Sequence, residues 1–477
     1  MASSKQTKIV ATVSDLRCGV DFIRDLYEAG MNVVRMNSAH LQKDGFDRII
    51  SNAREVSSKI ALLVDTKGPE LRTTGIANDE TITFTTGDVV MITGNVASPT
   101  TADCINVSYP NIVDDLNVGD VILIDDGELE FVVTEKSDSH LTCTSNNDGE
   151  LGSRKSVNVP GVRINLPSLT DRDKVNIDYA IKQDIDFIAH SFVRSKQDVL
   201  DIQEILDEQD SKIKIIAKIE NQEGVDNIDE ILEAAYGVMV ARGDLGIEIP
   251  QEKIPGIQRA LIRKCVLAKK PVIVATQMLH SMIKNPRPTR AEVTDIANAI
   301  YYRTDALMLS GETAYGKYPV EAVATMAKIA KEAETSKIKE NDIRVDSNME
   351  KMDVPSFLAK QAVRSVNKLD VKAIITDSRT GKTVRNIAAY RGSCPVLAIC
   401  HTERTMRELA LSYGIEPIYH PNCSTMREHL YTGILRLLEK GRLTYDELIA
   451  FVGTTNDRVN GSTMLEINRV DRVLSTI

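Results

Sequence analysis

The sequence alternates short apolar runs with amphipathic stretches, and this alternation constrains the fold more than any other feature. The apolar runs have the length of buried strands, and stretches such as Val20–Ala29, Asp44–Ser58 and Val320–Glu334 have helical periodicity. Eight strand-and-helix units of this kind predict a closed parallel barrel of the α/β class, the (β/α)8 TIM barrel. The eight predicted strands are Lys8–Val13, Asn32–Asn37, Ile60–Thr66, Asp186–Phe192, Lys214–Glu220, Gly237–Arg242, Pro271–Gln277 and Asp305–Gly311.

A long segment of different composition separates the third predicted strand from the fourth. Residues 72–163 are rich in Thr, Val, Asp and Gly, and the runs Val121–Ile124 and Leu129–Thr134 alternate with the period of two that is typical of antiparallel strands. We predict a small β-barrel domain here, inserted into a barrel domain made of residues 1–71 and 164–338. An insertion at the carboxyl end of a barrel strand is placed to act as a lid.

A second boundary is expected near Ile338–Pro355, where a polar, charged stretch fits a solvated linker. Beyond it, residues 339–477 alternate strand and helix patterns again, which predicts a separate C-terminal α/β domain. The expected elements are the strands Val371–Asp377 and Pro395–Cys400 and the helices Thr383–Arg391 and Glu403–Tyr413.

Composition and charge exclude several classes of protein. The formal net charge of −10 argues against nucleic acid as a partner, because phosphate backbones are bound by an excess of Lys and Arg. No apolar run approaches the ~18 residues of a membrane span, and Met1–Gln6 have no apolar signal segment. The seven cysteines are scattered without a C-x-x-C pair, which favours a reduced cytoplasmic setting.

Charged and polar residues gather where the predicted barrel strands end. The active site of a β/α barrel lies at this carboxyl end. Strand ends are generally polar, but this tendency poorly explains Arg, Asp, Lys and Glu converging on one face. The end segments are Arg35-Met36-Asn37, Asp65-Thr66-Lys67, Lys218-Ile219-Glu220-Asn221, Arg242-Gly243-Asp244, Thr276-Gln277 and Ser310-Gly311-Glu312-Thr313.

The residue types at these ends suit phosphoryl transfer. Glu220 and Asp244 end neighbouring strands, so their carboxylates can share one Mg²⁺ ion. Arg35 and Arg72 offer forked donors for phosphate. Lys218 shares a strand face with Glu220, where its ammonium can stabilise charge that develops during the reaction. The alternative for Lys218 is a purely structural ion pair with Glu220.

The segment Gly243-Asp244-Leu245-Gly246 follows a predicted strand and precedes Pro250–Ala268, which contains a helical stretch. Backbone N–H groups exposed in such a loop can hold a carboxylate. A tight glycine turn without a binding role is the equally open alternative.

Several long strings, in the right order, resemble the pyruvate kinase family over nearly the whole chain. The resemblance implies that the chain transfers the phosphoryl group of phosphoenolpyruvate to ADP, giving pyruvate and ATP in the last step of glycolysis. It also implies a catalytic barrel, a lid and a C-terminal regulatory domain in a cytoplasmic homotetramer. The strings are Asn32–Asn37, Asp65–Arg72, Lys218–Asn221, Met239–Glu248, Ala275–Leu279 and Leu309–Ala314.

The resemblance also implies roles for individual residues. The catalytic candidates are Lys218, Arg35 and Thr276, of which Arg35 would contact the phosphoryl group and Lys218 would stabilise the transition state. The N–H groups of Gly243 and Asp244, with Thr276, would hold the substrate carboxylate. The implied ion and nucleotide ligands are Glu220 and Asp244 for Mg²⁺ (or Mn²⁺), Asn37, Asp65 and Thr66 for K⁺, and His40, Arg72 and the lid residue Lys155 for the nucleotide phosphates.

The chain departs from the family pattern in three places. Ser14-Asp15 replaces a glycine-proline pair beside the nucleotide, Ala39 replaces a K⁺-binding serine, and Ser156 replaces a glycine after the lid lysine. One alternative is a binding or regulatory paralogue with poor turnover, which the intact catalytic residues oppose. Another is a Mg²⁺-dependent lyase or aldolase acting on phosphoenolpyruvate or pyruvate, which would not need the lid or Lys155.

The start of the C-terminal domain offers a candidate effector site. There a predicted strand ends and a helix begins, and hydroxyl and N–H groups at such a junction suit a phosphate; a capped helix start is the alternative. Asp377 stands where some fructose-bisphosphate-activated members carry a base, and the chain has no Trp. We therefore expect a phosphosugar or nucleotide monophosphate effector, or none. The candidates are Thr376, Ser378, Arg379 and Thr380.

Two residues bear on the monovalent cation. Family members with a glutamate at the position of Glu70 tend to need K⁺, whereas members with lysine there carry an internal substitute. Ala39 deletes one hydroxyl ligand, which water can replace. We expect K⁺ to activate, with weakened affinity.

Overall fold

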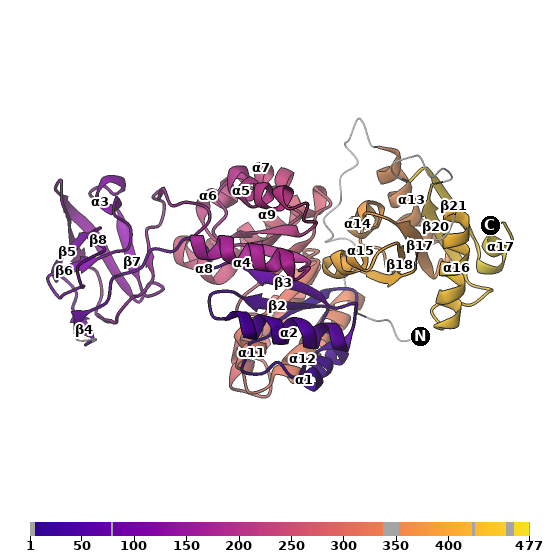
Figure 1. Ribbon diagram of the computed structural model, residues 1–477, viewed down its shortest axis with the longest axis horizontal. Helices are drawn as coiled ribbons and strands as arrows, with labels where there is room; N and C mark the ends of the chain where they lie inside the picture. Colours follow the sequence, from indigo (N-terminus) through magenta and orange to yellow (C-terminus); the bar gives the residue numbers. More distant parts are fainter. Residues whose placement is uncertain (1–4, 78–79, 337–352, 422–424, 455–461, 477) are drawn as a thin grey trace.

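The computed structural model describes residues 5–77, 80–336, 353–421, 425–454 and 462–476. Its three bodies lie in a row: a β domain at one end, a β/α barrel in the middle, and an α/β domain at the other end (Figure 1). Most of the predicted linker Ile338–Pro355 lies outside the described residues. Its last two residues belong to helix α13 (Val354–Leu369), where Pro355 fits the first turn because a proline there lacks only an N–H that would be unpaired anyway.

The central body is a closed barrel of eight parallel strands in the order β1-β16-β15-β14-β13-β12-β3-β2. This confirms the eight predicted strands, each of which is shorter than expected by one to three residues. Their interior faces pack around Val10, Leu63, Phe187 and Ile216, all fully buried. The strands are β1 Lys8–Thr12, β2 Val33–Asn37, β3 Ala61–Asp65, β12 Phe187–His190, β13 Lys214–Ile219, β14 Gly237–Ala241, β15 Val272–Ala275 and β16 Ala306–Leu309.

The outer faces of the strands form a second, larger apolar layer with the surrounding helices. The predicted helix Val20–Ala29 is confirmed as α1 with the same bounds. The expected loop Gly243–Gly246 is wrong, because these residues lie inside the short helix α8. The barrel-domain helices are α1 Val20–Ala29, α2 Lys43–Val56, α4 Asp171–Lys182, α5 Lys196–Glu208, α6 Gln222–Asp226, α7 Ile228–Ala234, α8 Arg242–Glu248, α9 Ile254–Leu267, α10 Arg290–Tyr301, α11 Gly311–Ala314 and α12 Pro319–Thr335.

The β domain lies between β3 and β12 in the chain and has its own apolar core. A six-stranded sheet in the order β11-β7-β8-β9-β5-β6 and a two-stranded sheet β10-β4 enclose this core. The predicted pair β7 and β8 is antiparallel, as expected, whereas β5 and β6 are parallel. The elements are β4 Ile82–Phe84, β5 Val89–Thr93, β6 Cys104–Asn106, α3 Ile112–Asp115, β7 Val121–Ile124, β8 Leu129–Lys136, β9 Leu141–Ser145, β10 Gly149–Leu151 and β11 Val157–Asn158.

The C-terminal body is a five-stranded sheet in the order β19-β18-β17-β20-β21, with an apolar cluster on each face. All neighbouring pairs are parallel except β20 and β21. The expected helix Glu403–Tyr413 is shorter, because a 3-10 turn follows α15 at Leu409–Leu411. The other elements are β17 Ala373–Ser378, α14 Lys382–Ala389, β18 Val396–Cys400, α15 Glu403–Glu408, β19 Ile415–Tyr419, α16 Met426–Glu439, β20 Leu448–Gly453, β21 Met464–Arg469 and α17 Val470–Thr476.

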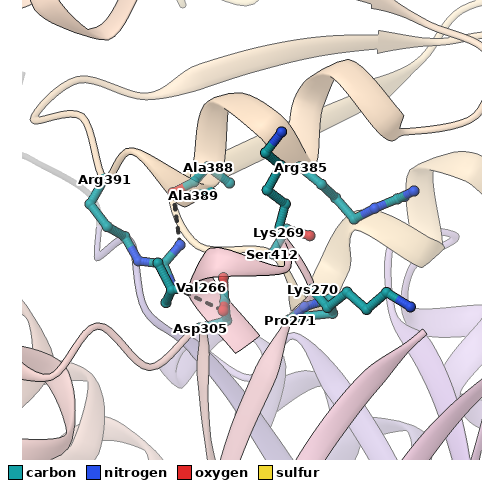
Figure 2. A pocket seen from close by; sticks show the side chains of 10 residues that line it. All are labelled: Val266, Lys269, Lys270, Pro271, Asp305, Arg385, Ala388, Ala389, Arg391 and Ser412. Carbon is teal, nitrogen blue, oxygen red and sulfur yellow. Dashed lines mark hydrogen bonds and ion pairs between the residues drawn. The ribbon is translucent and has the colours of Figure 1, made fainter. Parts of the chain in front are cut away.

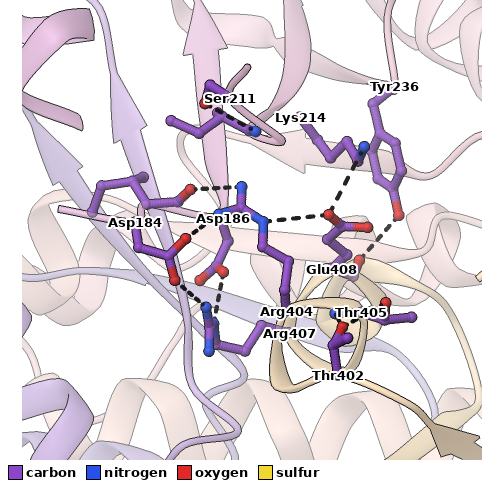
Figure 3. A network of polar contacts seen from close by, with 12 residues as sticks. Asp184, Asp186, Ser211, Lys214, Tyr236, Thr402, Arg404, Thr405, Arg407 and Glu408 are labelled. Atoms are coloured by element: carbon purple, nitrogen blue, oxygen red, sulfur yellow. Dashed lines mark hydrogen bonds and ion pairs between the residues drawn. The ribbon is translucent and has the colours of Figure 1, made fainter. Parts of the chain in front are cut away.

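The C-terminal body contacts the amino end of the barrel strands. Arg407 of α15 pairs with Asp184 and Asp186, at 2.8 and 2.7 Å, just ahead of β12 (Figure 3). Arg391 pairs with Asp305 at 2.9 Å, just ahead of β16, beside a small cationic pocket (Figure 2). The chain leaves the carboxyl end of β3 to form the β domain, which lies at the opposite end of the barrel from the C-terminal body (Figure 1). None of the described helices is long and apolar enough to cross a bilayer.

Candidate active site

Four charged side chains meet at the carboxyl end of the barrel. Arg35, on β2, donates from Nε and Nη2 to Asp65 Oδ2 at 2.7 and 2.5 Å. Lys218, on β13, places Nζ 3.0 Å from Asp65 Oδ1 and 3.0 Å from Glu220 Oε1. Asp65, at the end of β3, thus holds an arginine and a lysine side by side, and Lys218 bridges two carboxylates.

Electrostatics in this cluster keep the lysine charged. Burial alone would lower the pKa of Lys218, but the carboxylates of Asp65 and Glu220 outweigh it and raise the pKa above its usual value. Burial would likewise raise the pKa of Asp65, yet Arg35 and Lys218 together lower it. The site therefore holds a permanent ammonium in a region shielded from water, where its charge acts strongly on a nearby reacting group.

Glu220 is a buried carboxylate whose negative charge its neighbours only partly offset. Its Oε2 accepts the Phe192 N–H at 2.7 Å, and its side chain is almost fully buried. Burial raises the pKa of Glu220, and the negative charge of Asp244 raises it further. The positive charge of Lys218 acts in the opposite direction but does not outweigh them. Two carboxylates in this relation fit a shared divalent cation, because its charge would offset both burial and their mutual repulsion.

The end of β15 has an unusual backbone. Thr276 and Gln277 both have positive φ, 67° and 54°, and a β-branched residue such as threonine seldom adopts this region. Thr276 Oγ1 accepts the Gly243 N–H at 2.8 Å, and the Thr276 carbonyl accepts Arg242 Nη2 at 2.6 Å. Backbone strain of this kind is typical of functional sites. The two hydrogen bonds to Thr276 tie the start of α8 to the end of β15.

The three predicted K⁺ ligands lie on the ends of two adjacent strands. Asn37 and Asp65 are register partners of β2 and β3, and Thr66 follows directly. Asn37 Oδ1 accepts the Ala39 N–H at 3.0 Å, and the Thr66 carbonyl accepts Ser191 Oγ at 2.7 Å. Amide, carboxylate and carbonyl oxygens are a donor set that suits a hard monovalent cation.

The three nucleotide candidates are not brought together. His40 is exposed beyond β2. Arg72 donates from Nε and Nη2 to both Glu70 oxygens, at 2.9 and 2.7 Å. Lys155 pairs within the β domain, 2.5 Å from Asp125. A cavity of about 540 Å³ lies between this domain and the barrel mouth, with Glu70, Ser156 and Asp244 in its lining.

Comparison with known proteins identifies the family. The model described as "Pyruvate kinase, barrel domain" matches residues 4–323, and "Pyruvate kinase, alpha/beta domain" matches residues 357–467. The chain belongs to the pyruvate kinase family. A pyruvate kinase of Borreliella burgdorferi is 47% identical over 476 residues, 98% of each chain, and one of Geobacillus stearothermophilus is 44% identical over 469 residues, 97% of this chain and 79% of that one.

A solved structure supports the same assignment. A pyruvate kinase from Cryptosporidium parvum superposes with a TM-score of 0.91 at 34% identity, covering 98% of this chain and 96% of that one. The activity of a pyruvate kinase is the transfer of the phosphoryl group of phosphoenolpyruvate to ADP, which gives pyruvate and ATP in glycolysis. This chain is such a phosphotransferase, and the lyase or aldolase alternative is set aside.

Two residues that contact this candidate site were missed from the sequence. Ser191 Oγ lies 2.7 Å from Lys218 Nζ and 3.3 Å from Asp65 Oδ1, and Thr12 Oγ1 accepts Arg35 Nη1 at 3.1 Å. Both residues lie at the carboxyl ends of predicted barrel strands, Thr12 on β1 and Ser191 just after β12. The same positional rule that selected Lys218 would have found them, had neutral hydroxyls been counted with the charged residues.

The predicted effector residues of this pyruvate kinase lie together at the end of β17, but they differ in exposure. Thr376 and Ser378 are buried, and Ser378 Oγ accepts the Gly381 N–H at 3.1 Å. Arg379 and Thr380 are exposed. Ser378 thus closes the turn that leads into α14, and the two exposed residues form its outer edge.

Proposed function

We propose that Lys218, Arg35 and Thr276 carry out phosphoryl transfer at the barrel mouth. The observation that supports this most is the ammonium of Lys218, buried and 3.0 Å from both Asp65 and Glu220. It can stabilise negative charge on the phosphoryl group and on the enolate oxygen, where that charge develops. Arg35, fixed by Asp65 beside it, offers its remaining N–H groups to the phosphoryl oxygens.

The substrate carboxylate is assigned to the junction of β15 and α8. The Gly243 N–H donates to Thr276 Oγ1, and the Thr276 hydroxyl donates to the Ala275 carbonyl. An arriving carboxylate would replace these two bonds and accept from the Gly243 and Asp244 N–H groups and from the Thr276 hydroxyl. The strained backbone fixes Thr276 before the substrate arrives. Preorganisation of this kind lowers the entropic cost of aligning the reacting atoms.

Glu220 and Asp244 are proposed to hold Mg²⁺ (or Mn²⁺). When bound, the ion would neutralise phosphoryl charge and align substrate oxygens. The phosphorus–oxygen bond to the enol oxygen then breaks as a β-phosphate oxygen of ADP bonds to phosphorus. The resulting enolate takes a proton at its terminal carbon and becomes pyruvate. Arg35 and Lys218 are proposed to flank the transferring group as it passes between the two oxygens.

Arg72, His40 and Lys155 are proposed to bind the nucleotide phosphates once the β domain closes as a lid. Lys155 is held by Asp125 within that domain, so closure would exchange one anionic partner for another. None of the three residues lines the cavity of about 540 Å³ between the β domain and the barrel, so closure would have to bring them to the nucleotide.

The proposal is tested by a coupled assay for pyruvate and ATP. With phosphoenolpyruvate, ADP and Mg²⁺, the purified protein is expected to form both products in equal amounts. Pyruvate released without ADP, or no turnover with any divalent cation, would contradict phosphoryl transfer at this site. The absence of any turnover would favour a binding paralogue whose Ser14-Asp15 loop no longer accepts ADP.

We expect K⁺ to raise turnover. The carboxylate of Glu70 neutralises Arg72 in a two-bond pair, so the pocket gains no surplus positive charge from that arginine. Phosphoenolpyruvate and nucleotide would add several negative charges there, which a cation held by Asn37, Asp65 and Thr66 would offset. Activity is measured as KCl replaces a bulky organic salt at constant ionic strength. Full activity without K⁺, Na⁺ or NH₄⁺ would show that the Ala39 site is not used.

We propose the assembly, location and regulation of the chain from its membership of the pyruvate kinase family. A homotetramer would have four times the 52.7 kDa mass of the chain, which light scattering measures. The six described cysteines are all free, which supports the cytoplasm. A phosphorylated effector would bind at Arg379 and Thr380, and isothermal titration with a phosphosugar or a nucleotide monophosphate tests that site.

A further inference from the structure

A cluster of histidines lies where the C-terminal sheet presents the ends of its parallel strands. Asp377 is on β17, His401 follows β18, and His429 lies on α16, while His420 follows β19. Strand order reverses at β17, which has β18 on one side and β20 on the other. Ligands of open α/β sheets bind at the carboxyl ends of strands beside such a reversal.

The hydrogen-bond partners in this cluster determine which ring nitrogens must carry a hydrogen. Asp377 Oδ1 lies 2.7 Å from His401 Nε2 and 2.8 Å from His429 Nδ1. The other nitrogen of His429, Nε2, lies 3.1 Å from the backbone carbonyl of His420. A carboxylate and a carbonyl only accept, so His429 can satisfy both partners only with a hydrogen on each nitrogen. That would make it a cation, although its side chain is 1% exposed.

The second imidazole ring lies directly against His429. His401 and His429 stack with their centroids 3.9 Å apart and their planes 20° apart. His401 can donate to Asp377 through Nε2–H as a neutral ring, so only His429 needs to be a cation, and the Asp377 carboxylate balances that single charge. A divalent ion in place of the hydrogens shared with Asp377 would let both rings stay neutral and would keep the Nε2 hydrogen of His429 on the His420 carbonyl.

We propose that Asp377, His401 and His429 form a binding site for a divalent transition-metal ion. His429 would ligate through Nδ1 and keep its Nε2 hydrogen on the His420 carbonyl, the arrangement that usually orients a metal-bound histidine. His401 Nε2 and Asp377 Oδ1 complete three ligands, and all three atoms lie within 4.8 Å of one another.

The dimensions of the cluster fit this ion. Zinc ligands at about 2.0–2.2 Å in a tetrahedron are separated by roughly 3.3 Å. The present nitrogen–oxygen distances of 2.7 and 2.8 Å would open by about half an ångström. The two rings, now stacked with their planes 20° apart, would also have to turn away from each other so that both nitrogens face one ion. Two imidazoles and a carboxylate select zinc, cobalt, nickel or copper over Mg²⁺. The site is thus chemically distinct from the Mg²⁺ site proposed in the barrel.

The test uses the full-length chain, stripped of metal by a chelator and dialysed against micromolar Zn²⁺ in excess Mg²⁺. We expect one zinc retained per chain, and one Co²⁺ with a visible absorption band that Zn²⁺ abolishes. His401→Gln, Asp377→Asn and His429→Gln should each weaken binding by at least about 100-fold, because losing a ligand costs more than losing the 10–100-fold contribution of an outer contact. Zinc should also raise the melting temperature of the wild-type chain.

Matched controls separate this site from others. His140→Gln, just before β9 in the β domain, and Glu220→Gln, in the proposed Mg²⁺ site, should both retain the zinc. If His429→Gln does not fold, His401→Gln and Asp377→Asn decide the matter, because their side chains are less buried. A wild-type chain that retains no zinc, or a His401→Gln chain that retains as much as wild type, would overturn the proposal.

Discussion

Replacing Lys218 by alanine is expected to lower kcat by about 10²–10³, the usual effect of removing one electrostatic catalytic group. The ammonium lies between Asp65 and Glu220, in a region where water cannot screen its charge. Its effect is expected mainly on the transition state, so KM for phosphoenolpyruvate should change far less than kcat. Steady-state kinetics with saturating ADP and Mg²⁺ measure this difference.

One lysine variant and one serine variant serve as comparisons for Lys218→Ala. Lys155→Ala removes an equally charged but half-exposed lid residue and should raise KM for ADP more than it lowers kcat. Ser191→Ala removes one hydroxyl that accepts from the Lys218 ammonium but leaves both carboxylates in place, so it should cost about tenfold, less than Lys218→Ala. A Lys218→Ala enzyme within a few-fold of wild type would leave this lysine as a structural ion pair only.

Asp65→Asn is expected to lower kcat by a similar factor, about 10²–10³. The substitution keeps the shape of the side chain but removes the charge that holds Arg35 and Lys218 side by side. Arg35 would lose its charged acceptor, and Lys218 would keep Glu220 as its one carboxylate partner beside the neutral Ser191 hydroxyl. Both cations are then free to turn away from the phosphoryl group.

Stability provides an independent measurement on Asp65→Asn. Removing one partner from a buried pair commonly costs about 3–5 kcal/mol, because the remaining charges are left unbalanced. Urea unfolding should therefore detect a loss in the Asp65→Asn protein and little change in Asp125→Asn, whose carboxylate pairs with Lys155 at the surface. If Asp65→Asn kept wild-type turnover, Asp65 would have no part in positioning the two cations.

Much of the barrel could be predicted from local sequence. Strands such as β2 and β13 are short apolar runs, helices such as α1 and α12 have a clear apolar face, and their alternation leaves few topologies. The helix α8 was mistaken for a loop, because two glycines in seven residues hide a helical pattern. The bounds of β15 were too wide, since the positive φ of Thr276 and Gln277 ends the strand without a local signal.

The candidate site was predicted from residues at the ends of strands, and the structure added the contacts between their side chains. That Lys218 and Glu220 lie together follows from the two-residue period of a strand, and they do lie together. Asp65 was assigned to K⁺ alone, whereas its carboxylate also holds Arg35 and Lys218. These three residues belong to β3, β2 and β13, and only closure of the barrel determines which side chains touch.

The sequence by itself determined the family, the eight-stranded barrel, the β domain inserted after its third strand and the charged residues at the strand ends, because each of these is written in local periodicity or in contiguous motifs. Only the tertiary structure decided which charges pair, that Lys155 is held by Asp125, and that Asp377 meets His401 and His429. Those three residues are separated by more than 20 positions each and lie on a strand, a loop and a helix. Contacts of that kind depend on sheet order and on the rotation of a helix against the sheet, and neither leaves a periodic signal along the chain.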